Sequence, residues 1–364
     1  MQMTQKKIGA GQFFSILLLC RLLVNLTFNS NDSSLSSCDK IISDILTVAF
    51  IFVMSIPVFI YMKKGWDFSD CIRSISPKLN KAVCFFYSLY FIILASITVT
   101  RFQLFTTSTL VSEGNVTNVL YIALLVLSAL YGAYLGFQAI GRAAFIFAIV
   151  VISAIFFLFL TSAKNFDFVN ITPFFYNGTK NILQNAVKNA ASTTEIAMLT
   201  MFHSRVSGNK VKGQAITILI FLILELLLSV PSCLVLGDLA PKLFFPEYVL
   251  ATMASLDMLK SLDAFINACW VLAATIKTAF MIILSHFCIG NVFKIKKNLP
   301  WLVGIALVVF SISLVFSKYI STFILIIGSF NFIIASFVFS VAIPLIVLIV
   351  HALKERKNKK EGLL

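Results

Sequence analysis

The sequence predicts an all-α polytopic membrane protein with about ten transmembrane helices. Of its 364 residues, 59% are hydrophobic and only 12% are charged, and its mean hydropathy is +0.97. One soluble core of this length does not bury so many apolar residues, so we infer that the bilayer is the solvent. Two further observations support this class: ten apolar stretches of roughly the 20 residues that a spanning helix needs, and an uneven distribution of basic residues between them.

The ten stretches follow one another along almost the whole chain, which is therefore predicted to be a single transmembrane domain over 1–364. They cover residues 8–28, 41–62, 82–110, 116–139, 143–162, 182–202, 215–236, 259–289, 301–317 and 322–353.

Basic residues alternate between rich and poor gaps. Of the 29 Lys and Arg residues, nineteen lie in one alternate set of gaps and termini and five in the other set, and five lie within or close to the apolar stretches. Cytoplasmic loops accumulate Lys and Arg, so both termini are predicted to be cytoplasmic, with a basic tail over 354–364. The net charge of +14 is then an orientation signal and gives no support to nucleic-acid binding.

No catalytic or metal-binding pattern is visible. The seven cysteines are scattered without paired spacing, and the three histidines are dispersed, with neither an HExxH motif nor a nucleophile elbow. We expect no disulfide framework, no metal and no cofactor, and the sequence argues against an enzyme.

The two halves of the chain have matching helix lengths at an offset of about 175 residues. Residues 8–162 form the predicted first five-helix repeat and residues 182–353 the second. An odd number of helices per half inverts the second half, which is the five-plus-five plan of LeuT and of the amino acid-polyamine-organocation transporters. The alternative is that ten helices of similar length look loosely periodic without any repeat.

Local motifs resemble a known family. The segments 8–14, 134–142, 173–178, 182–186 and 261–265 are similar to parts of the B subunits of bacterial spore germinant receptors, the GerAB-type spore permeases, and Glu195 falls where that family carries a glutamate. The resemblance implies a subunit that senses a small nutrient such as an amino acid. It also implies partners, an A subunit and a lipoprotein C subunit, and a place in the spore inner membrane.

Arg21 and Glu195 are the two most informative intramembrane charges. Each lies roughly 16–18 Å from a predicted membrane edge at 1.5 Å per residue, near the middle of the hydrocarbon core. A charge there costs at least ~2.5 kcal/mol unless it is paired or hydrated. If the first and sixth helices are neighbours, the two side chains can hold the carboxylate and ammonium groups of an amino acid, or can form a permanent ion pair that locks the helices together.

Other polar residues complete the candidate binding site. The run Ala191, Ser192, Thr193, Thr194 suits local unwinding of the sixth helix around a ligand, although small residues also serve plain helix packing. Asn25, Asp263 and Asn267 can add polar ligands or simply packing bonds.

Lys277 and Glu225 are candidates for ion coupling or for lining a cleft. Lys277 can replace a sodium ion between the first and eighth helices, or it can snorkel or pair with Glu225.

Two principal functions remain. One is the germinant-sensing subunit, and the alternative is an autonomous proton-coupled amino-acid transporter with Glu195 or Lys277 as the coupling group. A third is a structural subunit without a ligand site, because the first and sixth helices lack the mid-membrane glycines that are usual in the resembled family.

Overall fold

The computed structural model describes residues 7–27, 35–109, 115–253, 262–293 and 298–361. Within these ranges eight helical segments are long and apolar enough to cross a membrane, which confirms the predicted all-helical, multi-pass architecture. They are Ser37–Lys64, Pro77–Thr109, Thr117–Leu135, Phe137–Asn165, Lys210–Lys242, Asn267–Val292, Asn298–Lys318 and Phe330–Glu355.

The other two predicted stretches take a different form. The first is helix α1 (Ala10–Thr27), whose apolar part is shorter than a full span, and the sixth is divided between α8 (Thr179–Ala191) and α9 (Glu195–Phe202).

The remaining elements complete the chain in order. Before α8 they are β1 (Ile8–Gly9), α2 (Ser37–Met54), α3 (Ile56–Lys64), α4 (Phe68–Ile75), α5 (Pro77–Thr109), α6 (Asn115–Leu135), α7 (Phe137–Ser162) and the 3₁₀ turns η1 (Ala163–Asn165) and η2 (Phe168–Ile171). After α9 they are η3 (His203–Arg205), β2 (Val206–Ser207), α10 (Lys210–Pro231), η4 (Ser232–Leu236), η5 (Gly237–Lys242), α11 (Pro246–Met253), α12 (Leu262–Val292), α13 (Asn298–Lys318), α14 (Ile320–Gly328), α15 (Phe330–Phe337), the π-helical turn η6 (Val338–Ala342) and α16 (Ile343–Glu361).

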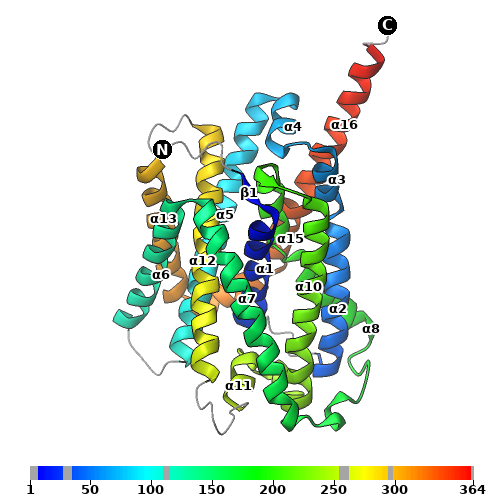
Figure 1. Cartoon of the computed structure of the whole chain (residues 1–364), viewed down its shortest axis with the longest axis vertical. Coiled ribbons are helices and arrows are strands. Elements are labelled where there is room, and N and C mark those ends of the chain that lie inside the picture. Colours follow the sequence, from blue (N-terminus) through cyan, green and yellow to red (C-terminus); the bar gives the residue numbers. More distant parts are fainter. Residues whose placement is uncertain (1–6, 28–34, 110–114, 254–261, 294–297, 362–364) are drawn as a thin grey trace.

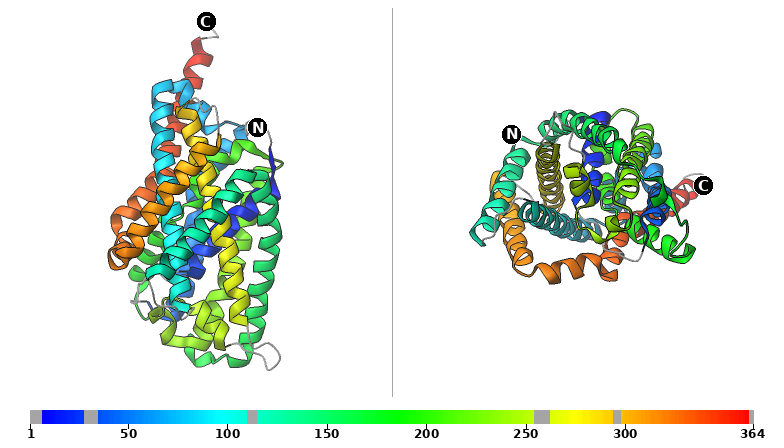
Figure 2. Two further views of the ribbon diagram at one scale, coloured as in Figure 1. Left: turned by 90° about the vertical axis from the view of Figure 1, so that its left-hand side faces the viewer. Right: turned by 90° about the horizontal axis from the view of Figure 1, so that it is seen from below.

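Helix α12 is the most enclosed span. It packs along α5, α6, α7 and α1, and 78% of its apolar window is buried, against 28% for α13. Figures 1 and 2 show α6 and α13 together on one flank. The start of α1 and the end of α16 lie at the same end of the bundle, called here the terminal end, and α11 lies at the opposite end (Figure 1).

The interruption between α8 and α9 has local causes. Ser192, Thr193 and Thr194 lie outside both helices, and their hydroxyls can bond backbone groups that an interruption frees. The Ser192 hydroxyl donates to the Asn189 carbonyl at 2.8 Å, and the Thr193 carbonyl accepts from the Ser340 hydroxyl at 3.0 Å. Since Ser340 lies in η6, two irregular segments stabilise each other.

A buried carboxylate fixes the segment that leads into α8. Asp39, in the first turn of α2, accepts hydrogen bonds from the backbone N–H groups of Phe175 at 2.7 Å and Asn177 at 2.9 Å. The Asn177 side chain in turn accepts from the backbone N–H of Ser36 at 2.6 Å. These bonds place α8 alongside α2, against which it packs.

Close backbone approach holds the start of α1. Strand β1 pairs in parallel with β2, with Ile8 opposite Val206. A Cβ atom at Gly141 of α7 would meet the Ile8 side chain, and one at Gly213 of α10 would meet the Phe14 ring, both at less than normal contact distance. Helices α7 and α10 therefore approach α1 only because glycine stands at these positions.

We expect Gly213→Ala to destabilise the protein by about 1–3 kcal/mol, because the Phe14 ring must move to admit the new methyl group. Gly304→Ala in α13 is the matched control, since its Cβ would meet no atom within 4 Å. Thermal melting of the detergent-solubilised proteins, with size-exclusion chromatography as the readout of folded protein, compares the two variants. A Gly213→Ala protein that melts at or above the control would contradict this packing.

Candidate functional site

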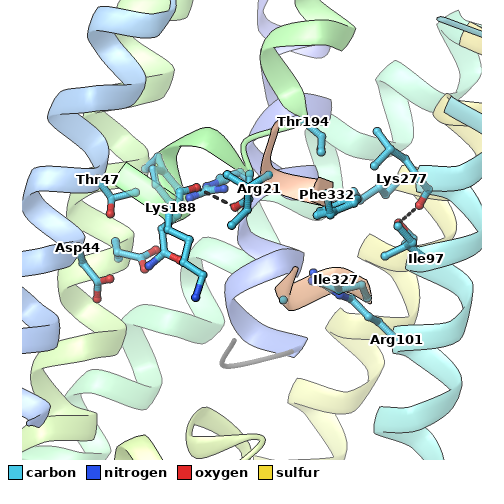
Figure 3. A pocket seen from close by; sticks show the side chains of 18 of the residues that line it. Arg21, Asp44, Thr47, Ile97, Arg101, Lys188, Thr194, Lys277, Ile327 and Phe332 are labelled. Atoms are coloured by element: carbon cyan, nitrogen blue, oxygen red, sulfur yellow. Dashed lines mark hydrogen bonds between the residues drawn. The ribbon is translucent and has the colours of Figure 1, made fainter. Parts of the chain in front are cut away.

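A cavity of about 120 Å³ lies beside the interruption between α8 and α9 (Figure 3). Side chains from α1, α2, α5, α8, α10, α11, α12, α14 and α15 form its wall. One buried water needs only about 10–15 Å³ on this measure, so the cavity has room for several waters or a small solute.

Charges of both signs line this main cavity. The basic side chains are Arg21, Lys40, Arg101, Lys188 and Lys277, and the acidic ones are Asp44, Glu225 and Glu247. In Figure 3, Asp44 and Lys188 lie on one side of Arg21, and Arg101 and Lys277 lie on the other. Charged groups within a bilayer are stable only when they are paired or hydrated, so this cavity suits a polar solute rather than an apolar one.

Lys277 joins three helices at the inner wall of the main cavity. Its Nζ donates to the Cys20 carbonyl of α1 at 2.8 Å and to Oε1 of Glu195 at 3.3 Å. Glu195 is the first residue of α9, where the positive end of the helix dipole favours a carboxylate. Both side chains are buried, at 4% and 9% exposure, so the pair is held away from bulk water.

Of the two arrangements expected from the sequence, the ion pair between Arg21 and Glu195 is not the one that the structure has. Glu195 forms its ion pair with Lys277, whereas the Arg21 guanidinium stacks over the Phe221 ring at 5.2 Å from the centroid. Arg21 is only 7% exposed, and its Nε has no hydrogen-bond partner among the described residues. Arg21 lines the main cavity, so its positive charge lies close to any anionic group that binds there.

The structure brings together part of the candidate site predicted from sequence. Arg21, Ser192, Thr194, Glu225 and Lys277 line the main cavity. Thr193 and Glu195 line a second, smaller cavity that also touches Arg21.

The other predicted site residues stand apart from these cavities. Ala191 ends α8 and Asn267 lies in α12, and neither lines either cavity; the buried Asn267 Oδ1 has no partner among the described residues. The side chains of Asn25 and Asp263 lie outside the described part of the chain.

Sequence reasoning assigned no role to five charged residues of the main cavity: Lys40, Asp44, Arg101, Lys188 and Glu247. Arg101 and Lys188 carried a usable signal, since each lies in or near an apolar stretch, and so did Asp44, which falls inside the second stretch. Glu247 carried none, because it lies between apolar stretches where acidic residues are common.

Glu247 lies in α11, outside the candidate spans, and is buried. Burial raises the pKa of its carboxyl to about 7, an effect that the positive charge of Lys40 opposes. This carboxyl therefore changes charge near neutral pH at the edge of the cavity.

An aromatic cluster lies on the terminal side of the main cavity. Phe13 and Phe202 stack at 5.6 Å, and Phe202 meets Phe137 and Phe280 edge-on, each at 5.4 Å. All four rings are buried, and Phe280 lies about one helical turn beyond Lys277 on α12. Along α1, Phe13 precedes Arg21 by about two helical turns, so the cluster lies nearer the terminal end of the bundle than Arg21 does.

Comparison with protein families shows to which family the chain is related. The sequence pattern of the spore germination proteins matches residues 40–321. The chain belongs to this spore germination permease family. The resemblance inferred from local motifs is thereby confirmed over most of the chain, and Arg21 lies before the matched part. No curated protein matches the chain.

The described residues contain no cluster of three His, Cys, Asp or Glu side chains that would hold a metal ion. Charged side chains of both signs line the main cavity, and these suit polar and ionic recognition.

Replacing Lys277 alone tests the buried ion pair. Lys277→Met leaves the Glu195 carboxylate buried without its cation, so we expect a loss of about 3–5 kcal/mol of stability. The double variant Lys277→Met with Glu195→Gln removes both charges and should recover most of that loss. Thermal melting of the purified proteins measures the difference. A double variant no more stable than the single one would contradict this pairing.

Proposed function

We propose that this spore germination permease is the nutrient-sensing membrane subunit of a germinant receptor and binds a small zwitterion, such as an amino acid, in the main cavity. The observation that carries the proposal is the coexistence of both signs of charge in one cavity beside an interrupted helix. In this arrangement Arg21 holds the ligand carboxylate, and Asp44, Glu225 and Glu247 attract its ammonium group. Ser192 and Thr194, at the interruption of the helix, add hydroxyl contacts.

For the fold, we propose ten membrane helices in a LeuT-like inverted repeat, with residues 8–162 and 182–353 as the two halves. The discontinuous α8 and α9 support it, since transporters of this plan bind substrate at broken helices. The basic residues of the alternate gaps support cytoplasmic termini and a cytoplasmic tail over 354–364, in a bacterial cell membrane or a spore inner membrane.

The proposed sensing mechanism is a shift between two conformations. A ligand changes the equilibrium only as far as it binds one state better than the other. The aromatic cluster of Phe13, Phe137, Phe202 and Phe280 is the natural moving part, because rings from four helices meet there. The receptor A subunit and the lipoprotein C subunit are the proposed partners that read this shift.

An autonomous proton-coupled amino-acid transporter is the second candidate. It is favoured by Lys277, whose ammonium lies between the Cys20 carbonyl and the Glu195 carboxylate. A cation held between a helix carbonyl and the start of an interrupted helix occupies a place where a coupling ion can act. In that reading, loss or gain of a proton at this pair couples to substrate movement.

Germination of spores tests the proposal. Spores carrying Arg21→Gln should need at least about 30-fold more nutrient, supplied as a mixture of the common amino acids, since a buried charge contact is worth about 2 kcal/mol or more. Arg73→Gln makes the same chemical change at an exposed arginine that pairs with Asp70, and should respond normally. Immunoblots confirm equal abundance.

Deletion of the gene provides the decisive comparison. A normal response in the deletion strain would contradict the sensing role and would direct attention to amino-acid uptake. A normal response in Arg21→Gln, with loss in the deletion, would contradict the assignment of Arg21 to the ligand.

The response should also depend on pH. Glu247 is uncharged below about pH 7 and charged above it, so attraction of the ligand ammonium should strengthen as pH rises through 7. Folding stability responds with the opposite sign. Because burial raises the pKa of Glu247 from 4.5 to about 7, the free energy of unfolding falls as pH rises through that range. Dose–response curves at roughly pH 6 and pH 8 measure the first effect. An unchanged pH dependence in Glu247→Gln would exclude this residue as its cause.

A further inference from the structure

A second cavity, of about 40 Å³, lies between α1, α2, α9 and α10. Arg21 and Phe221 line both cavities and so form the wall between them. The remaining wall of the second cavity is mainly aliphatic, from Leu17, Leu18, Ile51, Ile196 and Ile218.

Three polar atoms stand out in this aliphatic wall. Arg21 Nε, Glu195 Oε2 and Gln214 Oε1 are buried and have no hydrogen-bond partner among the described residues. Their residues are 7%, 7% and 6% exposed. The other carboxylate oxygen of Glu195, Oε1, accepts a hydrogen bond from Lys277, so Oε2 is the oxygen that lacks a partner among the described residues. Buried polar atoms are nearly always bonded, and three beside one cavity indicate a ligand.

We propose that the second cavity binds an ordered water molecule that bridges Arg21, Glu195 and Gln214. The chemistry is complementary, because water accepts one hydrogen bond from Arg21 Nε and donates one each to Glu195 Oε2 and Gln214 Oε1. The volume exceeds the roughly 10–15 Å³ that one water requires, and three polar partners is the usual number for a buried water. A metal cation does not fit these groups, since the Arg21 N–H donor would repel it.

The water links Arg21, at the edge of the main cavity, to the first turns of α10. Gln214 lies in the first turns of α10, toward the terminal end, whereas Arg21 borders the main cavity. This link rests on the proposed function: a ligand that binds the Arg21 side chain changes the hydrogen bonds of the water and hence the contacts of α10. Water binding itself needs no nutrient, so it is tested separately from that function.

X-ray radiolytic labelling in ¹⁸O-water, on the full chain in lipid nanodiscs, detects buried water through oxidation of neighbouring side chains. Leu18 should be labelled at least about fivefold faster than Leu284, and Ile218 faster than Ile282 by a similar factor. These two reference side chains are fully buried and line neither cavity. Leu18 labelled no faster than Leu284 would show a dry cavity and overturn the proposal.

Two variants assign the bonding. Gln214→Met keeps the side-chain length and removes the acceptor, so labelling of Leu18 and Ile218 should fall to the reference rates. Thr217→Val is the control in the same wall, since the Thr217 hydroxyl already donates to the Gly213 carbonyl at 2.9 Å and labelling should persist. Unchanged labelling in Gln214→Met, or an equal loss in both variants, would overturn the three-point bridge.

Discussion

The contact of Lys277 with Glu195 and the Cys20 carbonyl is the interaction on which the rest of the structure depends. It joins α12, the most enclosed span, to the start of α9 and to the middle of α1. The carboxylate lies at the first residue of α9 only because the helix stops at Ser192–Thr194, and that interruption is stabilised from η6. Without the lysine, the Glu195 carboxylate would be buried without a compensating charge, which is strongly destabilising.

Since Glu195 already has its own cation, the proposed recognition in the main cavity rests on other residues. Arg21 provides a cation that stacks on Phe221, and Asp44, Glu225 and Glu247 provide the opposite charge. The aromatic cluster of Phe13, Phe137, Phe202 and Phe280 lies on the terminal side of this arrangement and joins α1, α7, α9 and α12. Sensor and transporter would use the same cavity, and they differ in whether the cluster opens fully or only shifts.

Hydropathy and basic-residue counts predicted the membrane class, and local motifs predicted the family, because both depend on residues near one another in sequence. The partner of Glu195 was not predictable from sequence. Lys277 lies 82 positions after Glu195, and only helix packing shows that its long side chain reaches Glu195. Asp44 and Arg101 were visible as charges in apolar stretches, but nothing in the sequence indicated that they face one cavity with Arg21.

The most direct measurement is equilibrium binding of a mixture of the twenty common amino acids, radiolabelled, to the purified chain in lipid nanodiscs. We expect saturable retention of one or a few of them, at about one molecule per chain, since one cavity carries both signs of charge. Apolar amines and simple carboxylic acids should not compete at the same concentration, because each carries only one of the two charges that the cavity complements. Retention no greater than that of empty nanodiscs would contradict the central claim that this cavity recognises a zwitterion.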